Sequence, residues 1–380
     1  AAEMQNRLFQ RLGAWAMMAD EDLRRELLEL GADKHIDDAQ LANARTLFAR
    51  AIETPGGLKI QTIHSFCAGV LRRFPLEAQV SPQFREMEDR MAEILRAEVV
   101  DQMVIGPDAY VVHAMLAQFT GDDLTKFTAE IAGKRDAFAA PITNEQMKSS
   151  LGLNPDAQRN DALRVAFQGD EAAIVDDIKE AFRDQAASYK KLAAQLAALN
   201  FKNPDWAALE TLFGLFLYAN TCDSKSVNFP QSNHSKAVEA MAPIADTVHD
   251  WMDRVAAAKA HLWAMDAFDR TRALYDFAEV FVPAYEARKL EMGALDFDDL
   301  IRKAKALLIN PAVAQWVLYR LDGGIDHILV DEAQDTSPTQ WAVIEQLTQE
   351  FATGEGAHPD RERTIFVVGD KKQSIYSFQG

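Results

Sequence analysis

Two adjacent carboxylates, Asp331 and Glu332, follow the short apolar run Ile328-Leu329-Val330. The run predicts a buried strand, and ligands of parallel sheets collect outside the carboxyl ends of the strands. An Asp in that place can hold Mg²⁺, and a Glu can polarise an attacking water as a general base. The pattern therefore predicts metal-assisted phosphoryl transfer, with both carboxylates assigned to catalysis and to the metal. A solvated acidic turn is the alternative, because runs of charged residues usually lie at the surface.

The residues after the carboxylates predict the start of a helix. Ser337 suits the N-cap, Pro338 suits the first helical position, and Gln340 would complete a capping box. A strand, an acidic turn and a capped helix in this order favour a functional site over a surface charge pair.

A second aromatic and β-branched run, 364–368, predicts a second strand. In a parallel sheet, its end would bring Gln373 close to the carboxylates that follow the first strand. Gln373 can read a γ-phosphate by hydrogen bond and link the nucleotide state to Tyr376 and Phe378. Those two rings could stack on bases, at about 1–3 kcal/mol for each base. A polar loop with two aromatic residues in the core is the alternative.

A third candidate region is a strand-to-helix turn in the first part of the chain. Residues 58–63 alternate like a strand, and Ser65 is expected to cap the helix that follows. Thr62, His64 and Ser65 would then sit where hydroxyls and helix N-terminal amides bind phosphate. His64 and Cys67 are three residues apart and could bind zinc, but no second pair at ligand spacing accompanies them.

The elements that must position these residues are mostly helices. Helical patterns cover residues 1–30 and 38–52, and the stretch from about 80 to 290 is overwhelmingly helical, with prolines such as Pro283 as punctuation. The fold class predicted is α/β, with a parallel sheet and a large, mainly α-helical insertion. Asp296 is expected to cap a helix that ends at Leu308.

Further helix starts are expected at three places. Thr143 and Gln146 form a capping-box pattern, and Asn203-Pro204 and Asn310-Pro311 resemble helix N-termini.

Length and composition place the chain among ordinary soluble proteins. With 380 residues, 48% hydrophobic and 26% charged, it is long enough for two or three domains. It has no apolar run of ~18 residues and no secretory leader, and Cys67 and Cys222 give no disulfide framework. A cytoplasmic protein with no membrane contact is expected. The net charge of -18 weighs against a simple nucleic-acid-binding domain, but not against a motor that holds DNA in a narrow channel.

The 380 residues contain no G-x-x-x-x-G-K-[ST] phosphate loop. The nearest stretch, Gly133-Lys134-Arg135, lacks the first glycine and the hydroxyl residue. Without that loop, the β- and γ-phosphates of a nucleotide have no cradle.

Taken together, the motifs resemble those of the UvrD/Rep superfamily of DNA helicases. Within that superfamily the likeness is greatest to the AddA family of double-strand-break repair helicase–nucleases, of which RecB is a relative. The stretches that carry the resemblance are Ala1–Arg7 (motif Ia), Thr62–Cys67 with Leu71–Ala78 (motif Ib), Leu295–Leu300 (the LDFxDL helix), Val330–Asp335 (motif II) and Val368–Gly380 (motif III).

The resemblance implies a partial RecA-like P-loop motor domain with a large, mainly α-helical inserted subdomain. Residues 1–80 would form the first part of the motor domain, 81–290 the helical accessory insertion, and 291–380 the return to the motor domain.

The resemblance also implies ATP and Mg²⁺ as cofactors. Asp331 would be the metal ligand and Glu332 the catalytic base, and Gln373 would sense the γ-phosphate. The remaining residues that the resemblance assigns are Gln334 and Asp335, as nucleotide contacts, and Thr62, His64, Ser65, Tyr376 and Phe378, along a track for single-stranded DNA.

The function implied is that of an ATP-dependent 3′-to-5′ DNA helicase or translocase in double-strand-break repair by recombination. It would act on double-stranded DNA ends with a partner subunit of the AddB type. The family's phosphate loop precedes motif Ia and its second motor domain follows motif III. The chain is therefore expected to be an internal fragment that is inactive alone and, with a sheet edge left open, prone to aggregate.

Two other functions are compatible with the residues. One is a DNA- or partner-binding module without ATPase activity. The other is a non-helicase P-loop ATPase with a helical insertion, which would have no need of the possible base-stacking pair Tyr376 and Phe378.

Overall fold

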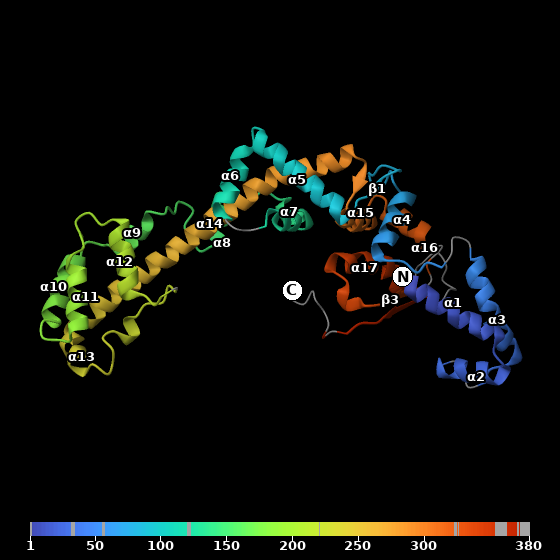
Figure 1. Ribbon diagram of the computed structural model, residues 1–380, viewed down its shortest axis with the longest axis horizontal. Helices are drawn as coiled ribbons and strands as arrows, with labels where there is room; N and C mark the ends of the chain where they lie inside the picture. The colour runs from blue at the N-terminus through green and yellow to red at the C-terminus, as the bar shows by residue number, and fades with distance from the viewer. Residues whose placement is uncertain are drawn as a thin grey trace. The chain divides into compact units, whose positions relative to one another are not determined.

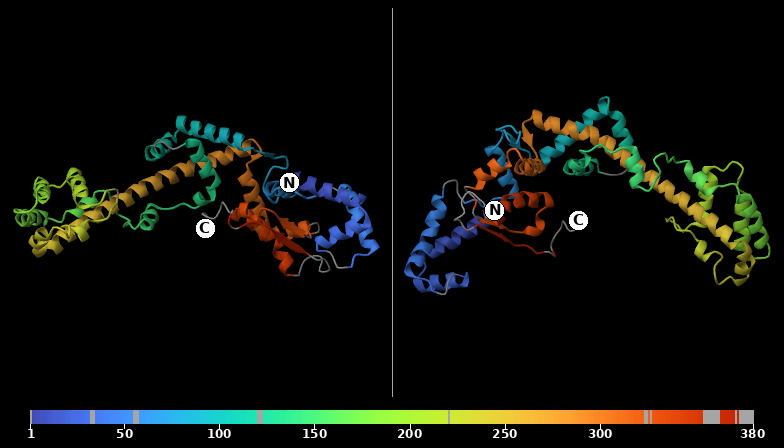
Figure 2. Two further views of the ribbon diagram at one scale, coloured as in Figure 1. Left: turned by 60° about the horizontal axis from the view of Figure 1, so that its bottom comes forward. Right: turned by 180° about the vertical axis from the view of Figure 1, so that it is seen from behind.

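The chain folds into helices and two small parallel sheets, which Figures 1 and 2 show in a computed structural model. The structure describes residues 2–31, 35–54, 58–119, 123–219, 221–322, 325, 327–353, 363–370 and 372. It divides into two compact units, the first comprising Ala1–Ala92 and Lys289–Gly380 and the second comprising Glu93–Arg288. No helix of the described residues is long and apolar enough to cross a membrane.

Three helices at the start of the first unit share one apolar core: α1 (Ala2–Met17), α2 (Asp20–Glu29) and α3 (Asp38–Glu53). The helix predicted over 38–52 is confirmed, and its N-terminus carries a capping box of Asp37 and Gln40. The helical stretch predicted over 1–30 is interrupted between α1 and α2. The buried side chains of this core are Leu12, Trp15, Leu23, Ile36, Leu41, Ala44 and Ala51.

Helix α4 (Ile63–Arg73) follows directly, and two predictions about its start are wrong. Residues 58–62 form no strand, because they have no neighbouring strand to pair with among the described residues. The N-cap is Thr62, whose Oγ1 accepts a hydrogen bond from the Ser65 backbone N–H at 3.3 Å. Ser65 therefore lies inside the first turn, where its amide is the group that needs a cap.

The second core of the first unit surrounds α15 (Phe297–Ile309). Helix α4 packs on it, together with α16 (Ala314–Asp322) and α17 (Pro338–Thr353). Helix α16 begins after a turn, a few residues later than predicted, whereas the Asp296 cap of α15 is confirmed. Strands β1 (Arg85–Glu86) and β2 (Ala294–Leu295) pair in parallel beside this core. Its most buried side chains include Cys67, Leu71, Phe74, Leu300, Ala304, Leu307, Val317 and Val343.

A buried ion cluster joins the end of α14 (Ala245–Glu291) to the start of α15. The Lys289 Nζ donates hydrogen bonds to Asp296 Oδ2 at 2.9 Å and to Asp299 Oδ2 at 2.6 Å. Asp296 and Asp299 also form the capping box of α15, each accepting from the backbone N–H of the other. The cluster therefore ties the helix cap to the preceding helix.

The two strands predicted from the apolar runs are confirmed as β3 (His327–Val330) and β4 (Thr364–Val367), which pair in parallel. Their predicted burial is wrong, because Leu329 is 74% exposed and Phe366 is 60% exposed. A sheet of two strands has few neighbours that could cover its side chains. This apolar surface is where the expected aggregation would begin.

The second unit is helical, as its sequence predicts. The predicted capping box of Thr143 and Gln146 is confirmed, whereas Asp205 caps α12 in place of Asn203. The α-helices described here, besides α14, are α5 (Asp89–Ile105), α6 (Ala109–Gln118), α7 (Leu124–Gly133), α8 (Asn144–Ser150), α9 (Asp161–Ala166), α10 (Glu171–Ala181), α11 (Ala187–Ala197), α12 (Trp206–Phe216) and α13 (Ser235–Met241).

The long helix α14 carries the cores of the second unit. Helices α9 to α13 pack around its first half, where Trp251 is fully buried (Figure 1). Pro283 does not end the helix, contrary to the prediction. Phe281 and Tyr285 flank it and are both buried, with their rings stacked at 5.9 Å between centroids. We infer that this packing offsets the ~3 kcal/mol that an internal proline costs a helix.

Burial decides the chemistry expected of Cys67. Its side chain is fully buried, and burial raises the pKa of the thiol to about 12. Such a thiol holds about a thousandfold less thiolate at pH 8 than one with a pKa of 9.0. We expect iodoacetamide to alkylate the half-buried Cys222 far faster than Cys67 in the folded chain. Mass spectrometry checks this, with the urea-unfolded chain as control, and equal rates in the folded chain would contradict it.

Candidate functional site

The two predicted carboxylates lie in a tight turn at the carboxyl end of β3. Asp331 and Glu332 are both exposed, and Glu332 adopts a left-handed backbone conformation with φ 51° and ψ 45°. This conformation is uncommon for a residue other than glycine, and such strain gathers at functional sites. The Glu332 carbonyl accepts a hydrogen bond from the Asp335 N–H at 2.9 Å, which closes the turn.

Helix α17 begins immediately after this turn, as predicted. The Ser337 N–H donates to Gln340 Oε1 at 3.1 Å, and the Gln340 N–H donates to Ser337 Oγ at 3.4 Å. The capping box therefore fixes the direction in which the chain leaves the carboxylates.

Parallel pairing brings the end of β4 against the same turn. The Val368 N–H donates to the Val330 carbonyl at 2.8 Å, and the Ala333 N–H donates to the Val368 carbonyl at 2.9 Å. Gly369 lies so close that a Cβ there would be 2.8 Å from Gln334 Oε1 and 3.0 Å from Ala333 Cβ. The motif II turn and the start of motif III are therefore packed together.

A single side chain bridges the two motifs. The Gln334 Nε2 donates to Glu332 Oε2, and the Gln334 Oε1 accepts from the Asp370 N–H at 3.0 Å. The sequence assigned Gln334 to the nucleotide, and it did not predict these protein contacts. The role of Gly369 was also missed, although a glycine directly after a strand is a signal of close backbone approach.

Three predicted residues, Gln373, Tyr376 and Phe378, lie outside the described residues. Their roles, and those of the other predicted site residues, stay predictions. Asp335 is exposed at the end of the turn.

The predicted DNA contacts that the structure describes lie at the start of α4. The hydroxyls of Thr62 and Ser65 are exposed and 3.1 Å apart. His64 is half-buried, and its ring packs edge-on against Phe297 with 5.2 Å between centroids. His64 therefore has a packing role whatever else it does.

The donor atoms at the acidic turn suit one kind of metal. Two exposed carboxylates supply oxygen ligands, and Mg²⁺ is usually held by one or two carboxylates together with phosphate oxygens and water. Among the described residues, no cluster of three or more His, Cys, Asp or Glu side chains could hold a metal ion. The residues present therefore fit Mg²⁺ that is shared with a phosphate.

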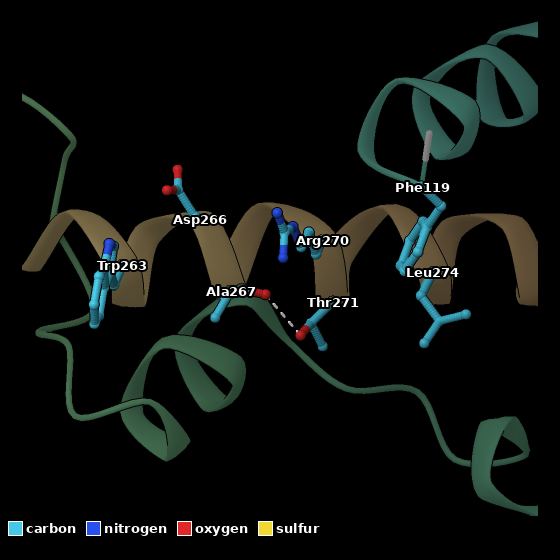
Figure 3. A pocket seen from close by; sticks show the side chains of 7 residues that line it. All are labelled: Phe119, Trp263, Asp266, Ala267, Arg270, Thr271 and Leu274. Atoms are coloured by element: carbon cyan, nitrogen blue, oxygen red, sulfur yellow. Dashed lines mark hydrogen bonds between the residues drawn. The ribbon is translucent and has the colours of Figure 1, made fainter. Parts of the chain in front are cut away.

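A pocket of about 590 Å³ lies elsewhere, on α14 in the second unit (Figure 3). Phe119 and Leu274 lie at one end of it and Trp263 at the other, with Arg270 between them. Asp266, on the same stretch, pairs with Arg159 at 2.6 Å. None of the predicted site residues lines this pocket, which is completed by Ala267 and Thr271.

Comparison with known proteins decides the family. The model of the UvrD/REP helicase N-terminal domain matches residues 1–380. The chain belongs to this family. The superfamily resemblance inferred from the five motifs is thereby confirmed.

Three relatives of this UvrD/REP chain are each named as the A subunit of an ATP-dependent helicase/nuclease. The protein of Listeria innocua is 25% identical over 385 residues, which cover 91% of this chain and 30% of the relative. That of Desulforudis audaxviator is 25% identical over 395 residues, 93% of this chain and 30% of the relative. That of Listeria welshimeri is 24% identical over 355 residues, 84% and 28%. The chain therefore spans less than a third of the length of these relatives.

Proposed function

We propose that this UvrD/REP chain is part of an ATP-dependent 3′-to-5′ DNA helicase or translocase that acts in double-strand-break repair by recombination. The first unit would belong to a RecA-like P-loop motor domain, and the second would be its inserted accessory subdomain. The observation that carries the proposal is the acidic turn, where a strand end, two carboxylates and a second parallel strand end meet.

The chemistry of this site would be ATP hydrolysis. Asp331, with its exposed carboxylate at the strand end, would hold Mg²⁺, and Glu332 would accept a proton from the attacking water. Mg²⁺, when bound, would neutralise charge on the phosphates. Asp335 and Gln373 would contact the nucleotide, Gln373 at the γ-phosphate.

Single-stranded DNA would be bound along the motor domain. The exposed hydroxyls of Thr62 and Ser65 and the ring of His64 would contact its backbone, as would be usual for polar groups at a helix start. Tyr376 and Phe378 would stack on bases. The names of the relatives describe one component of a multi-subunit helicase/nuclease, which supports an AddB-type partner and double-stranded DNA ends as substrate.

A DNA- or partner-binding module without ATPase activity is the second candidate. The observation that favours it is the lack of a phosphate-loop sequence in these 380 residues. The two candidates differ in one measurable property, which is ATP hydrolysis by a longer chain.

The experiment compares the full-length protein with residues 1–380 alone in an ATPase assay with and without single-stranded DNA. We expect strong DNA stimulation in the full-length protein. We expect no turnover above background from residues 1–380, because nothing in them cradles the β- and γ-phosphates. A full-length protein that binds DNA without hydrolysing ATP would favour the binding module. Turnover by residues 1–380 would refute the inactivity of the fragment.

A further inference from the structure

We propose that Gln334 is a positioning residue that orients the Glu332 carboxylate and ties it to the backbone at the end of β4. The inference rests on the proposed function, because Gln334 has this task only if Glu332 is the general base of ATP hydrolysis. It replaces the nucleotide contact predicted for Gln334 by a contact with the protein itself.

The amide group of Gln334 is matched to both of its partners. A carboxylate can only accept hydrogen bonds, and a backbone N–H can only donate one. Glu332 Oε2 therefore faces Nε2, and the Asp370 N–H faces Oε1 at 3.0 Å. Turning the amide over would lose both bonds. Because the amide is planar, its position on Asp370 also sets the direction of the bond to Glu332.

Glu332 is a residue for which such a restraint matters. Its side chain is exposed, and an exposed glutamate samples several rotamers. A general base must instead lie within hydrogen-bond reach of the proton that it abstracts. The left-handed backbone at Glu332 sets where the side chain starts, and the Gln334 bond sets where its carboxylate ends.

Gly369 brings the Asp370 N–H within reach of Gln334. Its Cα approaches the turn so closely that an added Cβ would fall 2.8 Å from Gln334 Oε1. The Ala333 N–H, bonded to the Val368 carbonyl at 2.9 Å, holds the turn to the strand end on the other side. A shift of residues 368–370 against β3 would therefore move the Gln334 amide and, through it, the Glu332 carboxylate.

The test measures ATP hydrolysis by the full-length protein at saturating single-stranded DNA, for the wild type and Gln334→Met. Methionine keeps the length of the side chain but can hold neither partner. We expect kcat to fall about 10- to 100-fold, the effect of a displacement of about 1 Å at a reacting group. The KM for ATP should change by less than about twofold. The matched control is Gln340→Met, which removes only a capping contact of α17 and should keep the wild-type kcat.

A second variant gives a readout that a purely structural role would not move. Gln334→Glu removes the donor and places a second carboxylate beside Glu332, and two neighbouring carboxylates resist double ionisation. We expect the acidic limb of its kcat–pH profile to move to higher pH. Gln334→Met should leave that limb where it is in the wild type.

Two results would overturn the proposal. One is an unchanged kcat in Gln334→Met, and the other is a higher KM for ATP at unchanged kcat, which would restore the nucleotide contact. If circular dichroism shows that Gln334→Met is unfolded, Gln334→Asn takes its place with the same expectations, because its amide is one methylene too short to bridge. A wild type without DNA-stimulated ATPase would refute the proposed function and this inference with it.

Discussion

Glu332→Gln in the full-length protein is expected to lower the kcat of DNA-stimulated ATP hydrolysis by about 10²- to 10⁴-fold. The amide that replaces the carboxylate cannot accept a proton from water at neutral pH. Its oxygen can still accept the hydrogen bond from Gln334 Nε2, and the left-handed turn is the same backbone problem for Gln as for Glu. The loss therefore reports charge and basicity, with little change of geometry.

The measurement is a steady-state ATPase assay together with equilibrium binding of ATP. We expect nucleotide binding to persist, because Glu332 acts on the water in this mechanism. The matched control is Glu345→Gln, an exposed glutamate on the outer part of α17, which should keep full activity. An active Glu332→Gln variant would remove Glu332 from the role of base.

Lys289→Met is expected to destabilise the start of α15 by about 3–5 kcal/mol. The lysine is 1% exposed, and its Nζ lies between the carboxylates of Asp296 and Asp299. Without it, two buried carboxylates would face each other with no cation of comparable burial between them. Because both belong to the capping box of α15, the helix start should open first.

Native-state hydrogen exchange of α15 measures this local effect without assuming that the whole chain unfolds in one step. We expect amides of 297–309 to exchange about 100- to 5,000-fold faster in Lys289→Met, which is the same free energy expressed as a rate. The matched control, Lys303→Met on α15, should change exchange little, because Lys303 lies outside this cluster.

A triple variant separates the lost charge from the lost packing. Adding Asp296→Asn and Asp299→Asn to Lys289→Met removes the facing carboxylates, and Asn is still a good N-cap. We expect exchange to return most of the way toward the wild-type rate, since whole buried ion clusters can be replaced at small cost. Equal exchange in the single and triple variants would show that the carboxylates are not the source of the loss.

The sequence alone determined the features that depend on neighbouring residues. The capping boxes at Ser337 and Thr143 and the cap at Asp296 follow from side chains that reach amides three residues away. The strands at 327–330 and 364–367 follow from local apolar runs. The motif order was enough to identify the superfamily, which the family model then confirmed.

Tertiary structure alone decided which of these elements are covered and which side chains meet. The pattern that predicts the β3 strand does not say how many strands lie beside it, so the exposure of Leu329 could not be foreseen. Nor could the continuation of α14 through Pro283, which depends on ring packing around it. Helix caps are local, whereas burial depends on every element that comes near.

The candidate site shows the same division. Local sequence placed Asp331 and Glu332 at a strand end, but the partner of Glu332 comes from a contact that also involves Asp370, 36 residues after Gln334. The lysine between Asp296 and Asp299 has no local signal either, because a Lys in a helical stretch is usually solvated. Side chains that meet across distant segments have pairings that no spacing along the chain encodes, and the fold alone sets them.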